Sequence, residues 1–215
     1  MTLRRAFALI AVFCVTVFAI RAIVHFTTNP ERPYDSTPTF WVVWLISSAF
    51  AALVLVRQAS VKNGHGSWRQ LGWHADALAP HLALGVAVGA LSITINVLTS
   101  LVVGATLSED LETITGYSSS ERAVFIAIGL QAAFIEESLF RGNLQPLLVA
   151  RWGRVVGLLA TAAIFSAYHL DPRPFSLASK FCVGLVYGAA RELTRGSLVA
   201  SGFGHFLVWT TVGSF

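Results

Sequence analysis

The stretch Ala123–Ala150 reads AVFIAIGLQAAFIEESLFRGNLQPLLVA and decides the class of fold. It is longer than the about 20 mostly apolar residues that a transmembrane helix needs. Glu136, Glu137 and Arg141 nevertheless lie near its middle. A charged side chain at the bilayer centre costs about 2.5–3.5 kcal/mol on insertion scales, so such residues mark functional sites by default. The stretch therefore predicts a membrane helix that carries a polar site.

The composition of the whole chain agrees with a membrane protein. Of its 215 residues, 55% are hydrophobic and only 12% are Asp, Glu, Lys or Arg, and the mean hydropathy is +0.67. A soluble domain has about 25% charged residues, so a conventional soluble globule is excluded, as is a disordered chain. Cys14 and Cys182 lie in apolar stretches, which excludes a disulfide scaffold and a cysteine-rich zinc site. The formal charge of +4 does not indicate nucleic-acid binding, because the basic residues lie in short loops.

Apolar segments predict an all-α fold, a polytopic membrane helix bundle of about seven transmembrane helices. We expect one integrated membrane domain, in which residues 1–120 form an N-terminal three-span region and residues 121–215 form the core with the polar site. The predicted spans are Ala6–His25, Thr39–Val56, Leu78–Val103, Ala123–Ala150, Val155–His169, Phe175–Ala190 and Ser197–Gly213.

The loops between these spans alternate in charge. One side carries most of the basic residues, which are Arg4, Arg5, Arg57, Lys62, Arg69, Arg151, Arg154, Arg191 and Arg195. The opposite side carries fewer, and it also holds the acidic loop around Glu109 and Asp110. The positive-inside rule therefore predicts a cytoplasmic N-terminus. A cleaved signal peptide is the alternative for the first segment, but its apolar run is longer than the usual 7–15 residues and no clean small-x-small site follows it.

The ionisable residues of the later spans predict a site. Glu137 and Arg141 are spaced i and i+4, so they share a helical face and can pair. Glu136 is turned by about 100° from Glu137, which leaves it to face a cavity as a general base. His169 and His205 lie at a similar depth, on the order of 15–22 Å from the cytoplasmic boundary at about 1.5 Å per residue. One Glu and two His at one depth have the composition of a water-activating site, with or without a metal.

Each of these residues also has an ordinary structural interpretation. Glu136 is then a second structural acid, His169 caps a helix, and His205 is a hydrogen-bonded core histidine. Lys180 snorkels to the outer surface, and Asn96 makes a hydrogen bond between helices.

The same residues carry a resemblance to a known family. Glu136 to Arg141 match the pattern EExxxR, Phe165 to His169 match FxxxH, and His205 follows in the third segment. The chain resembles the CPBP family of CAAX-protease and bacteriocin-processing intramembrane endopeptidases, also called the ABI family, over roughly residues 121–213. The resemblance implies that Glu136 activates a water with help from His169. It also implies that His205 and the residue four positions later stabilise the oxyanion.

The residue at that later position is Trp209, where the family has an amide or an acid. An indole N–H donates one hydrogen bond but accepts none. Because the family is described both as glutamate-type and as metal-dependent, a divalent metal such as zinc held by Glu136, His169 and His205 remains the alternative to a glutamate-activated water.

The resemblance implies an intramembrane endopeptidase of a bacterial cytoplasmic membrane, with a membrane-bound protein or peptide as substrate and the lipid bilayer as surroundings. A catalytically impaired member that binds membrane peptides, as an immunity or scaffold protein, is the alternative that Trp209 favours. A proton-coupled transporter would use the same intramembrane acids and histidines, but the sequence shows no inverted repeats.

Overall fold

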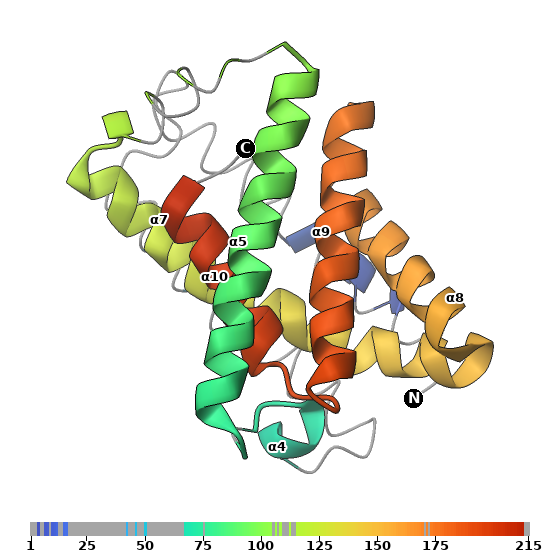
Figure 1. Ribbon diagram of the computed structural model, residues 1–215. Coiled ribbons are helices and arrows are strands. Elements are labelled where there is room, and N and C mark those ends of the chain that lie inside the picture. The colour runs from blue at the N-terminus through green and yellow to red at the C-terminus, as the bar shows by residue number, and fades with distance from the viewer. Residues whose placement is uncertain are drawn as a thin grey trace.

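The computed structural model describes residues 67–74, 76–104, 106, 108, 112, 115–169, 171 and 173–212, together with isolated positions between residues 4 and 50. This part of the chain is helical and contains no strand, which confirms the all-α class for the described residues. Figure 1 shows the helices, which in chain order are α4 (Trp68–Leu71), α5 (Leu78–Val102), α7 (Ser119–Gln131), η2 (Ala132–Glu136), η3 (Ser138–Leu144), α8 (Gln145–Tyr168), α9 (Pro174–Leu193) and α10 (Val199–Val212).

Several predicted spans coincide with these helices. The predictions Leu78–Val103, Phe175–Ala190 and Ser197–Gly213 correspond to α5, α9 and α10. The spans Ala6–His25 and Thr39–Val56 lie outside the described residues apart from scattered positions, so the count of seven remains a prediction. Two described helices, α5 and the stretch Ser119–Tyr168, are long and apolar enough to cross a membrane.

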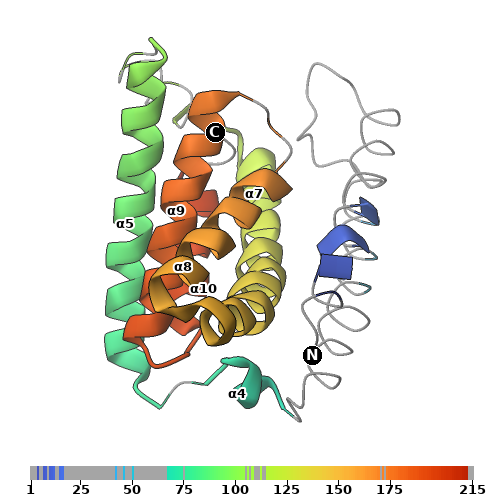
Figure 2. The same ribbon diagram turned by 90° about the vertical axis from the view of Figure 1, so that its right-hand side faces the viewer.

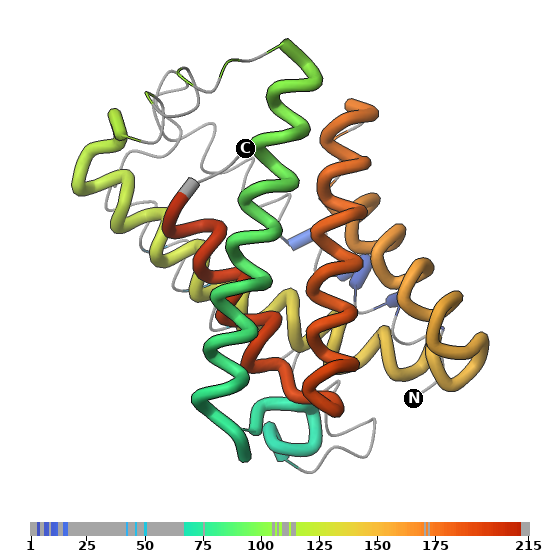
Figure 3. Tube along the Cα trace, in the orientation of Figure 1, coloured from blue at the N-terminus to red at the C-terminus, as the bar shows by residue number. Residues whose placement is uncertain are grey.

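The fourth and fifth predicted spans are separated by a tight turn at Gly153, which lies between Arg151 and Arg154 of the expected basic loop. The helical stretch runs from α7 through η2 and η3 into the first part of α8. Gly153, with φ 80° and ψ 168°, then breaks α8 into two helical parts. A Cβ atom on Gly157 would lie 2.6 Å from the backbone nitrogen of Val149, so the two parts of α8 lie side by side and the chain folds back at Gly153. Figure 3 traces this reversal between the yellow and orange parts of the chain. Glycine permits it because it has no Cβ atom to clash at positive φ.

The two segments around the glutamate pair are π-helical rather than α-helical. Glu137 is the single residue between η2 and η3. The Ser138 hydroxyl donates to the Phe134 carbonyl at 2.6 Å, and the Asn143 amide donates to the Ser138 carbonyl at 2.8 Å. These side chains compete with backbone donors for the same carbonyls. Short π segments within α-helices occur frequently at functional sites.

The helix α10 lies inside the bundle and packs against α5, α7, η2 and α9 (Figure 2). Small residues let the backbones approach closely, as is usual for helices in membranes. A Cβ atom on Gly85 of α5 would lie 3.0 Å from the ring of Phe203, and one on Gly204 of α10 would lie 2.5 Å from Val88. The helices α5 and α9 also pack together, and Ser179 donates to the Asn96 side chain at 2.6 Å. The predicted hydrogen bond of Asn96 between helices is thereby confirmed.

A short segment before α5 closes one end of the bundle. The backbone N–H of Leu198, at the start of α10, donates to the Gly72 carbonyl at 2.8 Å. The indole N–H of Trp73 donates to the Ser138 hydroxyl at 2.8 Å, and its ring stacks on Phe134. Residues 67–74, which we expected only as a loop, thus connect α10 to the π-helical segments.

Candidate active site

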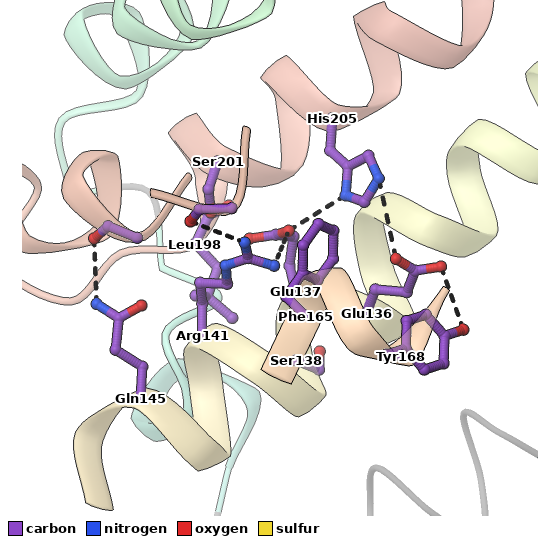
Figure 4. Close-up of polar contacts among 12 residues, drawn as sticks. Glu136, Glu137, Ser138, Arg141, Gln145, Phe165, Tyr168, Leu198, Ser201 and His205 are labelled. Carbon is purple, nitrogen blue, oxygen red and sulfur yellow. Dashed lines mark hydrogen bonds and ion pairs between the residues drawn. The ribbon is translucent and has the colours of Figure 1, made fainter. Parts of the chain in front are cut away.

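Glu137 and Arg141 form a fully buried ion pair at the centre of the bundle (Figure 4). Arg141 Nη1 lies 3.2 Å from Glu137 Oε1, and both side chains have 0% exposure. Arg141 Nη2 donates to the Gly184 carbonyl of α9 at 3.0 Å, and the guanidinium lies 4.2 Å from the ring centroid of Phe165. The spacing i, i+4 thus produces the expected pair, and the aromatic ring and the carbonyl replace water around the cation.

Glu136 lies between the side chains of His205 and Tyr168, as Figure 4 shows. Its Oε2 lies 4.0 Å from His205 Nε2, and the Tyr168 hydroxyl donates to its Oε1 at 3.5 Å. Its side chain keeps 14% exposure, whereas that of Glu137 keeps none. Adjacent glutamates therefore have different environments, one sealed with a guanidinium and one at a partly accessible position.

His205, on α10, connects the two carboxylates. Its Nδ1 lies 3.2 Å from Glu137 Oε1 and its Nε2 faces Glu136. Because an ionised carboxylate only accepts hydrogen bonds, we assign a proton to Nδ1. The imidazole is almost completely buried, with 6% exposure, between Tyr187 and Phe165.

His169 is the C-terminal cap residue of α8 and is half-buried. Its Nδ1 lies 2.8 Å from the Phe165 carbonyl, four residues earlier in the chain. The carbonyl accepts, so this contact assigns the proton to Nδ1, and Nε2 is then the acceptor nitrogen of the ring. The ring contacts Phe165 and Tyr168 at centroid distances of 4.8 Å and 5.1 Å. His169 and His205 therefore contact the same phenylalanine ring.

The loop after His169 carries a compact polar cluster. Asp171 binds Arg173 at 2.6 Å and Lys180 at 3.6 Å, and Lys180 also donates to Ser176. Hydrogen bonds from Arg173 hold the pKa of Asp171 well below its usual range. Lys180, which we expected to snorkel to the surface, reaches this loop.

Trp209 lies one helical turn after His205. A Cβ atom placed on Gly129 of α7 would lie 3.0 Å from the Cβ atom of Trp209. The Trp209 side chain therefore starts where α10 packs against α7. The indole is half-buried.

The side chains predicted as metal ligands do not form a three-ligand site. Within the described part of the chain, no group of three His, Cys, Asp or Glu side chains is arranged to hold a metal ion. His205 directs Nδ1 to Glu137 and Nε2 toward Glu136. Zinc held by Glu136, His169 and His205 remains a prediction from the sequence.

Two tyrosines beside the candidate site residues are not among the residues predicted from the sequence. Tyr168 directly precedes His169, so its position beside the FxxxH motif was a signal. Tyr187, on α9, stacks on His205 with ring centroids 4.8 Å apart. No spacing rule connected Tyr187 to the motifs, because the contact joins two different helices.

One comparison with known proteins finds a match in this part of the chain. Residues 118–211 match a family model described as type II CAAX prenyl endopeptidase Rce1-like. This region is Rce1-like. The match confirms the resemblance to the CPBP family that the three motifs carry. No curated protein and no solved structure matches the chain.

The Rce1-like region begins at the N-terminal cap of α7 and ends within α10. It contains Glu136, Glu137, Arg141, His169 and His205, whereas α4 and α5 precede it. Together with the apolar helices, the match supports a membrane-associated protease of the CAAX endopeptidase kind.

Proposed function

We propose that the chain is an intramembrane endopeptidase that hydrolyses a peptide bond of a membrane-bound, prenylated protein or peptide. The observation that carries the proposal is the contact of Glu136 with His205 beside a fully buried Glu137–Arg141 pair. In this pair the Arg141 guanidinium neutralises Glu137. Glu136 remains at a partly accessible position, where a general base for water is needed.

In the proposed reaction, Glu136 takes a proton from a water molecule as the oxygen of that water attacks the scissile carbonyl carbon. His169 accepts a hydrogen bond from the same water at Nε2 and orients it. The C–N bond of the tetrahedral intermediate then breaks, and the proton held by Glu136 goes to the leaving nitrogen. The products are a carboxylic acid and an amine, so one water is consumed.

His205 would stabilise the oxyanion through Nε2. The cluster of Glu136, Glu137, Arg141 and His205 contains two carboxylates and one guanidinium. If His205 is an imidazolium, the total charge of the cluster is zero. In that state Nδ1–H donates to Glu137 and Nε2–H is available to the developing negative charge. Preorganised donors of this kind contribute about 10²–10³ in turnover.

The test is the variant Glu136→Gln, assayed with a prenylated CAAX peptide in detergent micelles. Removing a general base lowers turnover about 10²–10⁴-fold, whereas Glu112→Gln, which changes an exposed acid outside the site, leaves it unchanged. Mass spectrometry of the shortened peptide measures both. A Glu136→Gln protein that has normal abundance in membranes and cleaves at the wild-type rate would contradict the assignment.

Trp209 favours a second candidate, a catalytically impaired protein that binds membrane peptides. The variant Trp209→Asn separates the two. A gain of cleavage identifies a weakened enzyme. Absence of cleavage by either form, with retained peptide binding, identifies a binding protein.

A further inference from the structure

Tyr187 belongs to none of the three motifs, yet it lies against the residue that connects them. Its side chain is fully buried in α9. Its ring stacks on the imidazole of His205 at a centroid distance of 4.8 Å and an interplanar angle of 30°. Phe165 meets the same imidazole with its edge, at 6.1 Å and 77°. Two aromatic rings therefore hold His205 from two directions.

The orientation of this imidazole decides which groups it can reach. Nδ1 and Nε2 point away from each other in the ring plane, toward Glu137 and Glu136 respectively. The second side-chain torsion of histidine is soft and broad, so the two contacts alone do not define the ring plane well. A stacked ring restricts rotation out of this plane, which keeps both nitrogens directed at their carboxylates.

The hydroxyl of Tyr187 has a different neighbour from the ring. It lies beside the hydroxyl of Ser92 on α5. Within the described residues, neither oxygen makes a hydrogen bond that meets the usual distance and angle limits. The aromatic face, in contrast, contacts His205 and lies 5.3 Å from the Arg141 guanidinium.

We infer that Tyr187 is a positioning residue, whose ring rather than its hydroxyl orients His205 between Glu136 and Glu137. The inference rests on the proposed function for its catalytic consequence. Its structural part, the orientation of the imidazole, can be measured without any substrate.

The structural test uses NMR of the histidine ring protons in detergent micelles, with the His205 signals assigned by their loss in His205→Gln. The ring current of a stacked aromatic shifts protons of the neighbouring imidazole upfield. Tyr187→Phe keeps this shift, whereas Tyr187→Leu and Tyr187→Met move the signals toward their unperturbed positions. Met fills a similar volume without a planar face, so it remains informative if Leu prevents folding. Unchanged His205 signals in folded Leu or Met variants would overturn the inference.

The functional test compares the same variants with a prenylated CAAX peptide. The kcat of Tyr187→Phe stays within about twofold of the wild-type value. The ring is retained, and the lost hydroxyl makes no hydrogen bond to a described residue within the usual distance and angle limits. Tyr187→Leu lowers kcat about 10²-fold with little change in KM, since misplacement of a catalytic group by about 1 Å has this cost. Phe175→Leu, an exposed aromatic of the same helix, is the matched control and behaves as the wild type.

Two outcomes of the functional test contradict the inference. Loss of activity in Tyr187→Phe would assign the role to the hydroxyl, and wild-type kcat in both Leu and Met would show that the ring is dispensable. If the wild-type protein cleaves no peptide, the proposed function fails, and the NMR comparison still decides the orientation of His205.

Discussion

At the scale of single residues, two adjacent glutamates have different surroundings. Glu137 has a guanidinium on its own helix and an imidazole on α10, and both contacts are 3.2 Å long. Such a buried pair is expensive to break, because the remaining charge keeps its desolvation penalty without its partner. Glu136 is turned away from Arg141 and keeps 14% exposure.

Arg141→Met tests the structural role of the pair. It leaves the Glu137 carboxylate buried without the guanidinium, so we expect a loss of about 3–5 kcal/mol in the free energy of unfolding. The double variant Arg141→Met with Glu137→Leu removes both charges and recovers much of this loss. Thermal unfolding in detergent measures both effects. Arg151→Met, which changes an exposed arginine, is the control, and an equal effect of the two single variants would disprove the structural role.

At the scale of elements, the long helical stretch is shaped by a few positions. The π-helical turns on either side of Glu137 place Glu136 and Glu137 where His205 contacts both. The reversal at Gly153 returns the second half of α8 to the bundle, and this brings Phe165 and His169 to the site. The site therefore depends on a glycine that lies outside it.

Gly153→Ala tests this dependence. A Cβ atom at this position meets no other atom within 4 Å, so any effect comes from the backbone conformation alone. The region near φ 80° and ψ 168° is accessible almost only to glycine, and a residue forced into it costs about 1–3 kcal/mol. We expect a lower melting temperature in detergent. The control Gly116→Ala also has open space around the Cβ atom, without a positive φ, and a loss of similar size there would refute the argument.

At the scale of the whole molecule, the site combines the Rce1-like region with helices that precede it. Trp73 contacts Ser138, directly after the glutamate pair, and Ser92 of α5 lies beside Tyr187. Helix α5 also presents Val86, Leu91 and Leu98 at its exposed surface, which suits contact with lipid. Residues that precede the Rce1-like region thus contact residues of the candidate site.

The predicted orientation can be tested with two engineered cysteines. In a background with Cys14→Ser and Cys182→Ser, Ser108→Cys lies on the side with the acidic loop and Arg151→Cys on the basic side. The positive-inside rule places the basic side in the cytoplasm. A membrane-impermeant thiol reagent should therefore label Ser108→Cys in intact cells and Arg151→Cys only after permeabilisation. The reverse pattern would invert the predicted topology.

The sequence by itself determined the features that depend on neighbours along the chain. Apolar runs predicted the helices α5, α9 and α10, and the i, i+4 spacing predicted the pair of Glu137 with Arg141. Composition indicated the membrane, because charge is too scarce to cover a soluble surface. The π-helical turns were not predictable from the same rules, since they depend on side chains that compete for backbone carbonyls.

Only the tertiary structure decided which helices meet and how each is rotated. Similar depth suggested that Glu136, His169 and His205 gather at one point, but depth fixes neither rotation nor distance. The packed helices bring His205 to both glutamates, hold His169 beside the ring of Phe165 and seat Tyr187 on the imidazole. These contacts arise between residues far apart in sequence, so packing of side chains, rather than any local pattern, selects them.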